Sequence, residues 1–124
     1  MKHLHLDKAF MKATRSEALI AQNGCCHYCC APLCQLTVTA DHKLPRSRGG
    51  KDARSNIAAA CFDCNQTKGR MTEGQFFSAI KKPPSPDMPF HLMRVWMRRK
   101  VFLQTHRSCA KLDKLFLSQP LSDS

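Results

Sequence analysis

Two pairs of cysteines have the spacing of metal ligands. Each pair forms a CxxC pattern, first at Cys26 and Cys29 and again at Cys61 and Cys64. This spacing lets two thiolates meet one ion while the backbone between them turns over it, and two such pairs make a tetrahedral four-thiolate site. We therefore predict a structural Zn2+ bound by these four cysteines.

Three further cysteines close to the first pair, Cys25, Cys30 and Cys34, allow other spacings there. We prefer the pair at 26 and 29 because its geometry matches that of the second pair. The opposite interpretation, in which all four are ordinary buried thiols, is less favoured, since two independent CxxC pairs are improbable in so short a chain. The three neighbours and Cys109 are expected to be small hydrophobic residues.

A histidine suited to proton transfer lies between the two cysteine pairs. Asp41 and His42 follow the short, β-branched segment 36–40, so we expect a strand that delivers both residues at its end. An imidazole with its ordinary pKa of about 6.5 is mostly neutral at pH 7 and can take a proton from water. Considered alone, a histidine in this place is more often a surface residue than a catalytic one.

The surrounding segment, TADHKLPRSRGGKDARSNIAAACFDCNQTKG, resembles the HNH nucleases of the ββα-metal (His-Me finger) group. Asp41 and His42 are similar to the opening pair of that family, Asn56 to its central asparagine and Asn65 to its third position. LPRSRGG resembles the family's loop, and CNQTKG resembles its closing helix. The resemblance covers residues 22–72 and includes the cysteines and the polar residues in the right order.

The resemblance implies a finger of two strands and one helix that binds a single divalent cation and cuts DNA. Asp41 and Asn65 are the implied ligands of that cation, and His42 is the implied base that activates water. Asn56 is expected to hold the loop and the backbone of His42 by hydrogen bonds. Oxygen ligands favour Mg2+ or Mn2+. The histidine that the colicin-type branch carries one turn later is Gly69 here, which disfavours a catalytic zinc.

The basic composition is consistent with a nucleic-acid partner. The chain has 20 Lys and Arg residues against 9 acidic ones, a net charge of +11, which indicates a polyanion such as nucleic acid or an acidic membrane surface. We expect double-stranded DNA and no membrane. Six basic residues near the site are predicted to contact phosphates: Arg46, Arg48, Lys51, Arg54, Lys68 and Arg70. The C-terminal segment allows two interpretations. It forms a second DNA-facing surface or, equally well, a helix that closes the core or a dimer. The basic residues concerned are Arg94, Arg98, Arg99, Lys100, Arg107, Lys111 and Lys114.

The elements that position these residues are short, and together they predict an α+β fold, a small zinc-stabilised ββα finger flanked by N-terminal and C-terminal helices. Asp7 is predicted to cap the first helix and Asn23 with Gly24 to end it, and Thr72 with Gln75 to form a capping box for a later helix. The expected order is a helix over 8–22, a strand over 36–40, a loop over 43–55, a strand over 56–60, a helix over 62–70, a helix that begins at 72 and stops before the prolines at 83 and 84, and one or two helices over 90–117.

The proline-rich segment provides the one expected boundary. We predict a nuclease domain with its N-terminal helix over 1–82, a stiff linker over 83–89 and a basic helical extension over 90–124. The start lacks the apolar region of a secretory signal and no run of about 18 apolar residues occurs, so a reducing cytosol is expected. Two alternatives remain open: a non-catalytic zinc finger that binds nucleic acid, and a zinc-stabilised interaction domain in a phage or plasmid assembly. A homodimer or a phage or mobile-element protein partner is also open.

Overall fold

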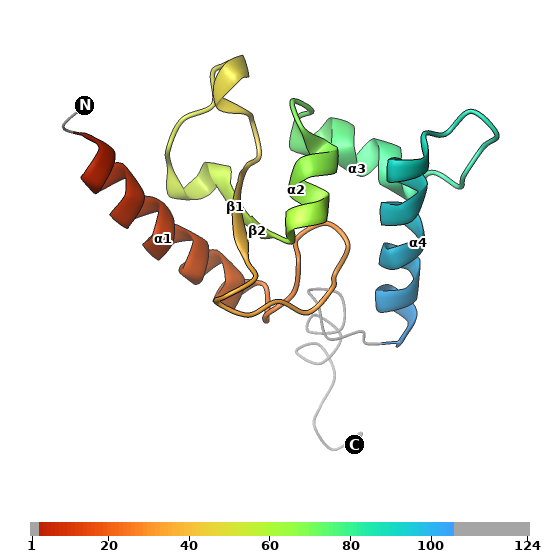
Figure 1. Ribbon diagram of the computed structural model, residues 1–124, viewed down its shortest axis with the longest axis horizontal. Coiled ribbons are helices and arrows are strands. Elements are labelled where there is room, and N and C mark those ends of the chain that lie inside the picture. The colour runs from red at the N-terminus through yellow and green to blue at the C-terminus, as the bar shows by residue number, and fades with distance from the viewer. Residues whose placement is uncertain (1–2, 106–124) are drawn as a thin grey trace.

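The computed structural model describes the backbone of residues 3–105 and the side chains of residues 8–104 (Figure 1). Four residues with a predicted role lie outside the described part: Arg107, Cys109, Lys111 and Lys114. The predicted α+β class is confirmed. The elements are α1 (His3–Ala21), β1 (Thr39–His42), the 3-10 turns η1 (Arg46–Arg48) and η2 (Arg54–Asn56), β2 (Ile57–Ala60), α2 (Phe62–Lys68), α3 (Glu73–Lys81) and α4 (Phe90–Thr105).

The sheet is a two-stranded antiparallel hairpin in which Asp41 pairs with Ala58 and His42 with Ile57. Figure 1 shows α1 on one side of the hairpin and α2, α3 and α4 on the other. The outward backbone groups of Ala59 are paired with the side chain of Gln22 at the end of α1, whose amide donates to the carbonyl (2.9 Å) and accepts from the N–H (3.0 Å). This exchange satisfies buried polar groups of β2 and fixes α1 against it.

Two predicted starts were wrong by three residues or more. The first strand begins at Thr39 rather than 36, because Thr37 and Val38 donate their N–H groups to the carbonyl of Cys34 and close a turn there. Asp41 and His42 therefore belong to the strand itself. The first helix begins at His3, so Asp7 lies within it and is not its cap.

Local signals at the other helix ends were predicted correctly. The N–H of Gly24, a residue with φ of 76°, donates to the carbonyl of Leu19 and ends α1. Thr72 and Gln75 form the predicted capping box at the start of α3. Cys61 also caps α2, a role that was not predicted from the sequence, and its Sγ accepts the N–H of Cys64.

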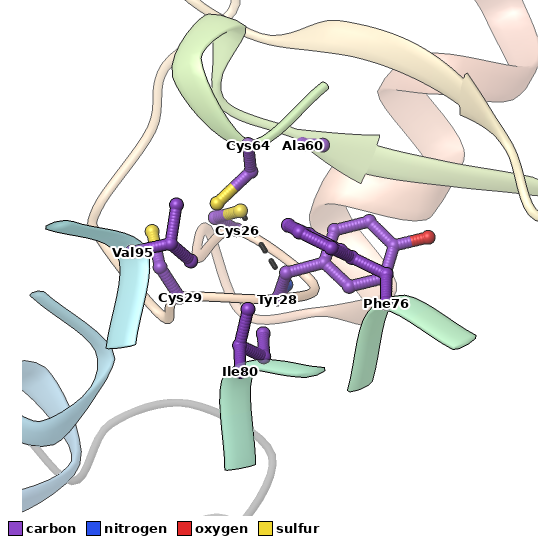
Figure 2. Packing of buried hydrophobic residues seen from close by; sticks show 8 residues of the cluster. All are labelled: Cys26, Tyr28, Cys29, Ala60, Cys64, Phe76, Ile80 and Val95. Carbon is purple, nitrogen blue, oxygen red and sulfur yellow. Dashed lines mark hydrogen bonds between the residues drawn. The ribbon is translucent and has the colours of Figure 1, made fainter. Parts of the chain in front are cut away.

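The main core is built around the cysteines (Figure 2). Tyr28, Phe76 and Val95 are fully buried there beside Cys26, Cys29 and Cys64. Val95 comes from α4, which follows the proline-rich segment and packs on α3 and α2. The division into a domain, a linker over 83–89 and an extension stays a prediction. None of the helices within residues 3–105 has the length and apolar character that crossing a membrane requires.

The loop between the strands makes one close backbone approach, at Gly50. A Cβ at this position would lie 1.7 Å from the carbonyl oxygen of Leu44 and 2.9 Å from that of Pro45. We expect Gly50→Ala to lower the free energy of unfolding, measured in urea, by at least about 3 kcal/mol, because backbone atoms must move to make room.

The neighbouring Gly49 provides a matched control. It has φ of 92°, and a Cβ added there would meet nothing within 4 Å, so only its left-handed backbone opposes alanine. Gly49→Ala should cost about 1 kcal/mol. Equal losses in the two variants would show that the contact at Gly50 does not restrain the loop.

Candidate functional site

The four cysteines predicted to bind metal lie together. Their Sγ atoms are all within 4.8 Å of one another, and those of Cys29 and Cys61 are 3.8 Å apart. Tetrahedral zinc with Zn–S distances of about 2.3 Å places its sulfur ligands about 3.8 Å apart. The cluster is therefore compatible with zinc. Of the cysteines that made the first pair ambiguous, Cys25 and Cys30 pack in a separate group with Phe102 and Leu103.

Backbone amides point at the sulfurs of this cluster. The N–H groups of Tyr28 (3.4 Å) and Cys61 (3.3 Å) donate to Sγ of Cys26, and that of Cys64 donates to Sγ of Cys61 at 3.3 Å. Such donors stabilise a thiolate more than a neutral thiol. The donor set thus suits a cation that takes thiolate ligands.

The pKa values of the four thiols are shifted in different directions. A hydrogen bond with Cys26 is the largest of the influences that lower the pKa of Cys61 to about 7, and Cys26 likewise lowers the pKa of Cys29. The pKa of Cys26 is raised, first by its hydrogen bond with Cys29, and that of Cys64 is raised, first by Cys26. All four sulfurs can become thiolates together only when a cation compensates their charge.

A separate pocket of about 180 Å³ lies between the end of β1, the basic loop and α2. Three of the four predicted catalytic residues line it: Asp41, His42 and Asn65. The fourth, Asn56, is not among the residues that line it. The full lining is Ala40, Asp41, His42, Pro45, Arg46, Asn65, Lys68 and Gly69.

Asp41 is buried and has a partner on each oxygen. Its Oδ2 accepts the hydroxyl of Tyr28 at 2.5 Å, and its Oδ1 lies 3.2 Å from Nζ of Lys68. Burial, followed by the charge of Asp41, raises the pKa of Tyr28 well above its ordinary value, so this hydroxyl remains a donor. The Lys68 ammonium also donates to the carbonyl of His42 at 2.8 Å. The side chain of Lys68 is 1% exposed, whereas a residue that contacts phosphate is expected at the surface.

His42 is held by a carboxylate that was not among the residues predicted from the sequence. Its Nε2 lies 2.8 Å from Oδ1 of Asp52, and Arg46 donates to both oxygens of the same carboxylate at 3.0 Å. Arg46, and then His42, lower the pKa of Asp52, which keeps it an acceptor. The hydrogen of His42 is therefore assigned to Nε2, which leaves Nδ1 as the basic nitrogen. The signal in the sequence that could have identified Asp52 was an acidic residue in an otherwise basic loop.

The two asparagines have different surroundings. Asn56 exchanges two hydrogen bonds with the backbone of Leu44 (2.9 and 3.0 Å) and donates to the carbonyl of Lys51 at 3.0 Å, so its amide closes the loop. Asn65 donates Nδ2 to Oγ1 of Thr39 (3.0 Å) and to the carbonyl of Ala40 (3.1 Å). For its Oδ1, no donor is recorded among the described residues, and this oxygen is the atom available to a cation.

Part of the chain matches a known protein family. Residues 26–80, somewhat less than half of the chain, match the family model described as HNH endonuclease. Over 56 residues, 44% of its length, the chain is 38% identical to a protein named CRISPR-associated endonuclease Cas9 from Corynebacterium diphtheriae. The matched region is 5% of that relative, so the chain spans a small part of its length.

One solved structure is the Type II-C Cas9 enzyme from Actinomyces naeslundii. The alignment covers 76% of this chain and 13% of the chain of that enzyme. The identity is 23% and the TM-score is 0.48. The resemblance to HNH nucleases in the sequence is thus confirmed by the family match over 26–80.

Exposed basic side chains lie on the loop between the strands and just after α2. Arg48 donates to the carbonyl of Arg70 (3.2 Å) and to Oε1 of Gln75 (2.8 Å), which ties the loop to the start of α3. Arg54 lies 3.3 Å from Glu17, with both side chains more than half exposed. Such an exposed pair contributes little to stability. Five of the six predicted phosphate contacts are exposed: Arg46, Arg48, Lys51, Arg54 and Arg70.

The basic residues of α4 contact the HNH segment and α4 itself. Arg94 donates to both oxygens of Asp63 (3.1 and 2.6 Å), and Arg99 donates to the carbonyl of Tyr28 at 2.9 Å. Lys100 lies 5.2 Å from the ring centre of Trp96. These contacts favour the alternative in which this helix closes the core.

Proposed function

We propose that this chain is a metal-dependent endonuclease that hydrolyses DNA phosphodiester bonds. The observation that carries the proposal is that Asp41, His42 and Asn65, from two elements of an HNH segment, line one pocket. In this proposal His42 activates water, and Asp41 and Asn65 hold Mg2+ or Mn2+. The four-cysteine cluster holds a structural zinc.

The proposed chemistry divides between the imidazole and the two oxygen ligands. A phosphodiester needs a base for the attacking water and an electrophile for the charge that develops on the phosphate and the leaving oxygen. Nδ1 of His42 accepts the proton of the water, while Asp52 holds Nε2 and stabilises the imidazolium that results. A divalent cation, when bound, supplies the electrophile. Asn65 is oriented by its two bonds to β1, and Asp41 by Tyr28.

Lys68 sets a condition on cation binding. A carboxylate offers about four lone-pair sites, so Oδ1 and Oδ2 of Asp41 can each take a second partner. A cation at Oδ1 must nevertheless compete with the ammonium of Lys68, which lies 3.2 Å away. This ion pair is the observation that favours the alternative function, a non-catalytic zinc finger that binds nucleic acid.

A plasmid assay separates the two functions. Zinc-loaded protein, incubated with supercoiled DNA, should convert it to nicked or linear forms only after Mg2+ or Mn2+ is added. Binding of the plasmid in a gel, with no cut product at any concentration of either ion, would contradict the nuclease proposal and support the non-catalytic module. We place the activity in a reducing compartment such as the cytosol, because zinc requires the cysteines as thiolates rather than disulfides.

DNA affinity should depend steeply on salt. With the five exposed predicted contacts, Kd is expected to rise by about 10²–10³-fold between 50 and 200 mM salt, since each neutralised phosphate releases counterions. Lys51→Ala should reduce the slope of log Kd against log salt by about one, measured by fluorescence anisotropy.

The control for Lys51→Ala is Lys82→Ala, an exposed lysine that follows α3 and does not line the pocket. It should leave the salt slope unchanged. The same slope in the wild type and Lys51→Ala would show that the basic loop does not contact phosphates.

A further inference from the structure

The guanidinium of Arg98, on α4, lies against the four-cysteine cluster. Its Nε is 3.2 Å from Sγ of Cys29, and its Nη2 is 3.4 Å from Sγ of Cys64 and 3.8 Å from that of Cys61. Figure 2 shows Val95, about one helical turn before Arg98, beside Cys29. One side chain from beyond the proline-rich segment thus contacts three of the four sulfurs.

The net charge of the proposed zinc centre explains why a positively charged side chain belongs beside it. Four thiolates and one Zn2+ carry a net charge of −2, and three of the four cysteines are buried. A buried charge is costly unless it is paired and hydrogen-bonded. Arginine is always protonated, and its planar fork of donors can serve several acceptors together. Arg98 therefore supplies both positive charge and N–H donors to the sulfurs.

Other polar contacts join α4 to residues inside both CxxC pairs. Asp63, inside the second CxxC pair, accepts from Arg94 and also lies 2.9 Å from Nη1 of Arg98. Arg99 donates to the carbonyl of Tyr28, which lies inside the first pair. The helix is thus attached to the two chain segments that the zinc would join.

We propose that Arg98 is an outer-sphere partner of the zinc centre, so that zinc retention and docking of α4 stabilise each other. This inference rests on the zinc site of the proposed function. It makes the C-terminal helix a part of the metal centre that slows zinc loss. Arg94 is attached to the same carboxylate of Asp63 but does not contact the four sulfurs of the cluster, and it therefore separates the role of Arg98 from a plain surface ion pair.

The test is the rate at which zinc-loaded protein releases zinc to a chromogenic chelator at neutral pH. Arg98→Gln should release zinc about 10–100-fold faster than the wild type, the range found when outer-shell partners of metal ligands are removed. Arg98→Lys, which keeps the charge without the fork, should fall between them. Arg94→Gln should differ from the wild type by less than about threefold. Equal rates in the Arg94 and Arg98 variants, or no acceleration by Arg98→Gln, would overturn the inference.

Docking of α4 is followed separately through Trp96, the chain's one tryptophan. In zinc-loaded Arg98→Gln, the Trp96 emission should move towards that of exposed tryptophan while the zinc content stays at one per chain. Emission identical to the wild type would contradict the docking part. If the wild type itself binds no zinc, the proposed zinc site fails; if it binds zinc with the same release rate in all variants, only the role of Arg98 fails.

Discussion

Replacement of His42 by alanine is expected to reduce DNA cleavage by about 10²–10⁴-fold, the usual contribution of a positioned general base. The rate to measure is single-turnover cleavage of a labelled duplex at saturating Mg2+. Fold and zinc content should be unchanged, because the side chain of His42 is bonded to Asp52 in the loop and belongs neither to the core nor to the cysteine cluster.

The matched control is His91→Ala, which removes an exposed histidine of α4 that does not line the pocket. It should cleave at the wild-type rate. Thermal unfolding followed by circular dichroism establishes that both variants are folded. Wild-type cleavage by folded, zinc-loaded His42→Ala would assign the base to another residue.

Cys61→Ser is expected to lose zinc and the cooperative fold together. Structural zinc contributes about 10–16 kcal/mol in zinc-finger peptides at pH 7, as much as or more than the whole stability of a typical domain. Cys61 also caps α2, and the main core contains the other three cysteines of the cluster. Atomic emission should find less than one zinc per chain, and thermal melting should show no sharp transition.

Cys34→Ser tests whether this loss is specific to the cluster. Cys34 is exposed, lies outside the four-cysteine group and bonds to Thr37 in a local turn. The variant should retain one zinc per chain and the wild-type melting temperature. A Cys61→Ser protein that keeps its zinc and melts like the wild type would show that the cluster does not hold the fold together.

Local sequence signals predicted most of the elements. The Thr72 capping box, the glycine after α1 and the prolines after α3 act within a few residues, so they identify helix ends without any knowledge of packing. The start of β1 was missed because the turn at Cys34 depends on backbone bonds that leave no clear trace in residue type.

The contacts of three charged residues were not predictable from the sequence. Lys68 lies beside other polar residues along the chain, but whether it faces solvent or Asp41 depends on how α2 packs on β1. Asp52 reaches His42 only because the loop closes on itself. Arg98 is far along the chain from the cysteines, and an amphipathic pattern indicates that a helix packs without indicating what it packs on.

The nuclease proposal is tested most directly by whether Asp41 and Asn65 hold one divalent cation. Mn2+ binding is measured by electron paramagnetic resonance on zinc-loaded His42→Ala protein with duplex DNA, so that the substrate stays intact. One Mn2+ per complex is expected, with affinity at least about tenfold weaker after Asn65→Ala and unchanged after Gln66→Ala, an exposed neighbour on α2. Equal Mn2+ affinity in all three proteins would contradict a cation site at Asn65.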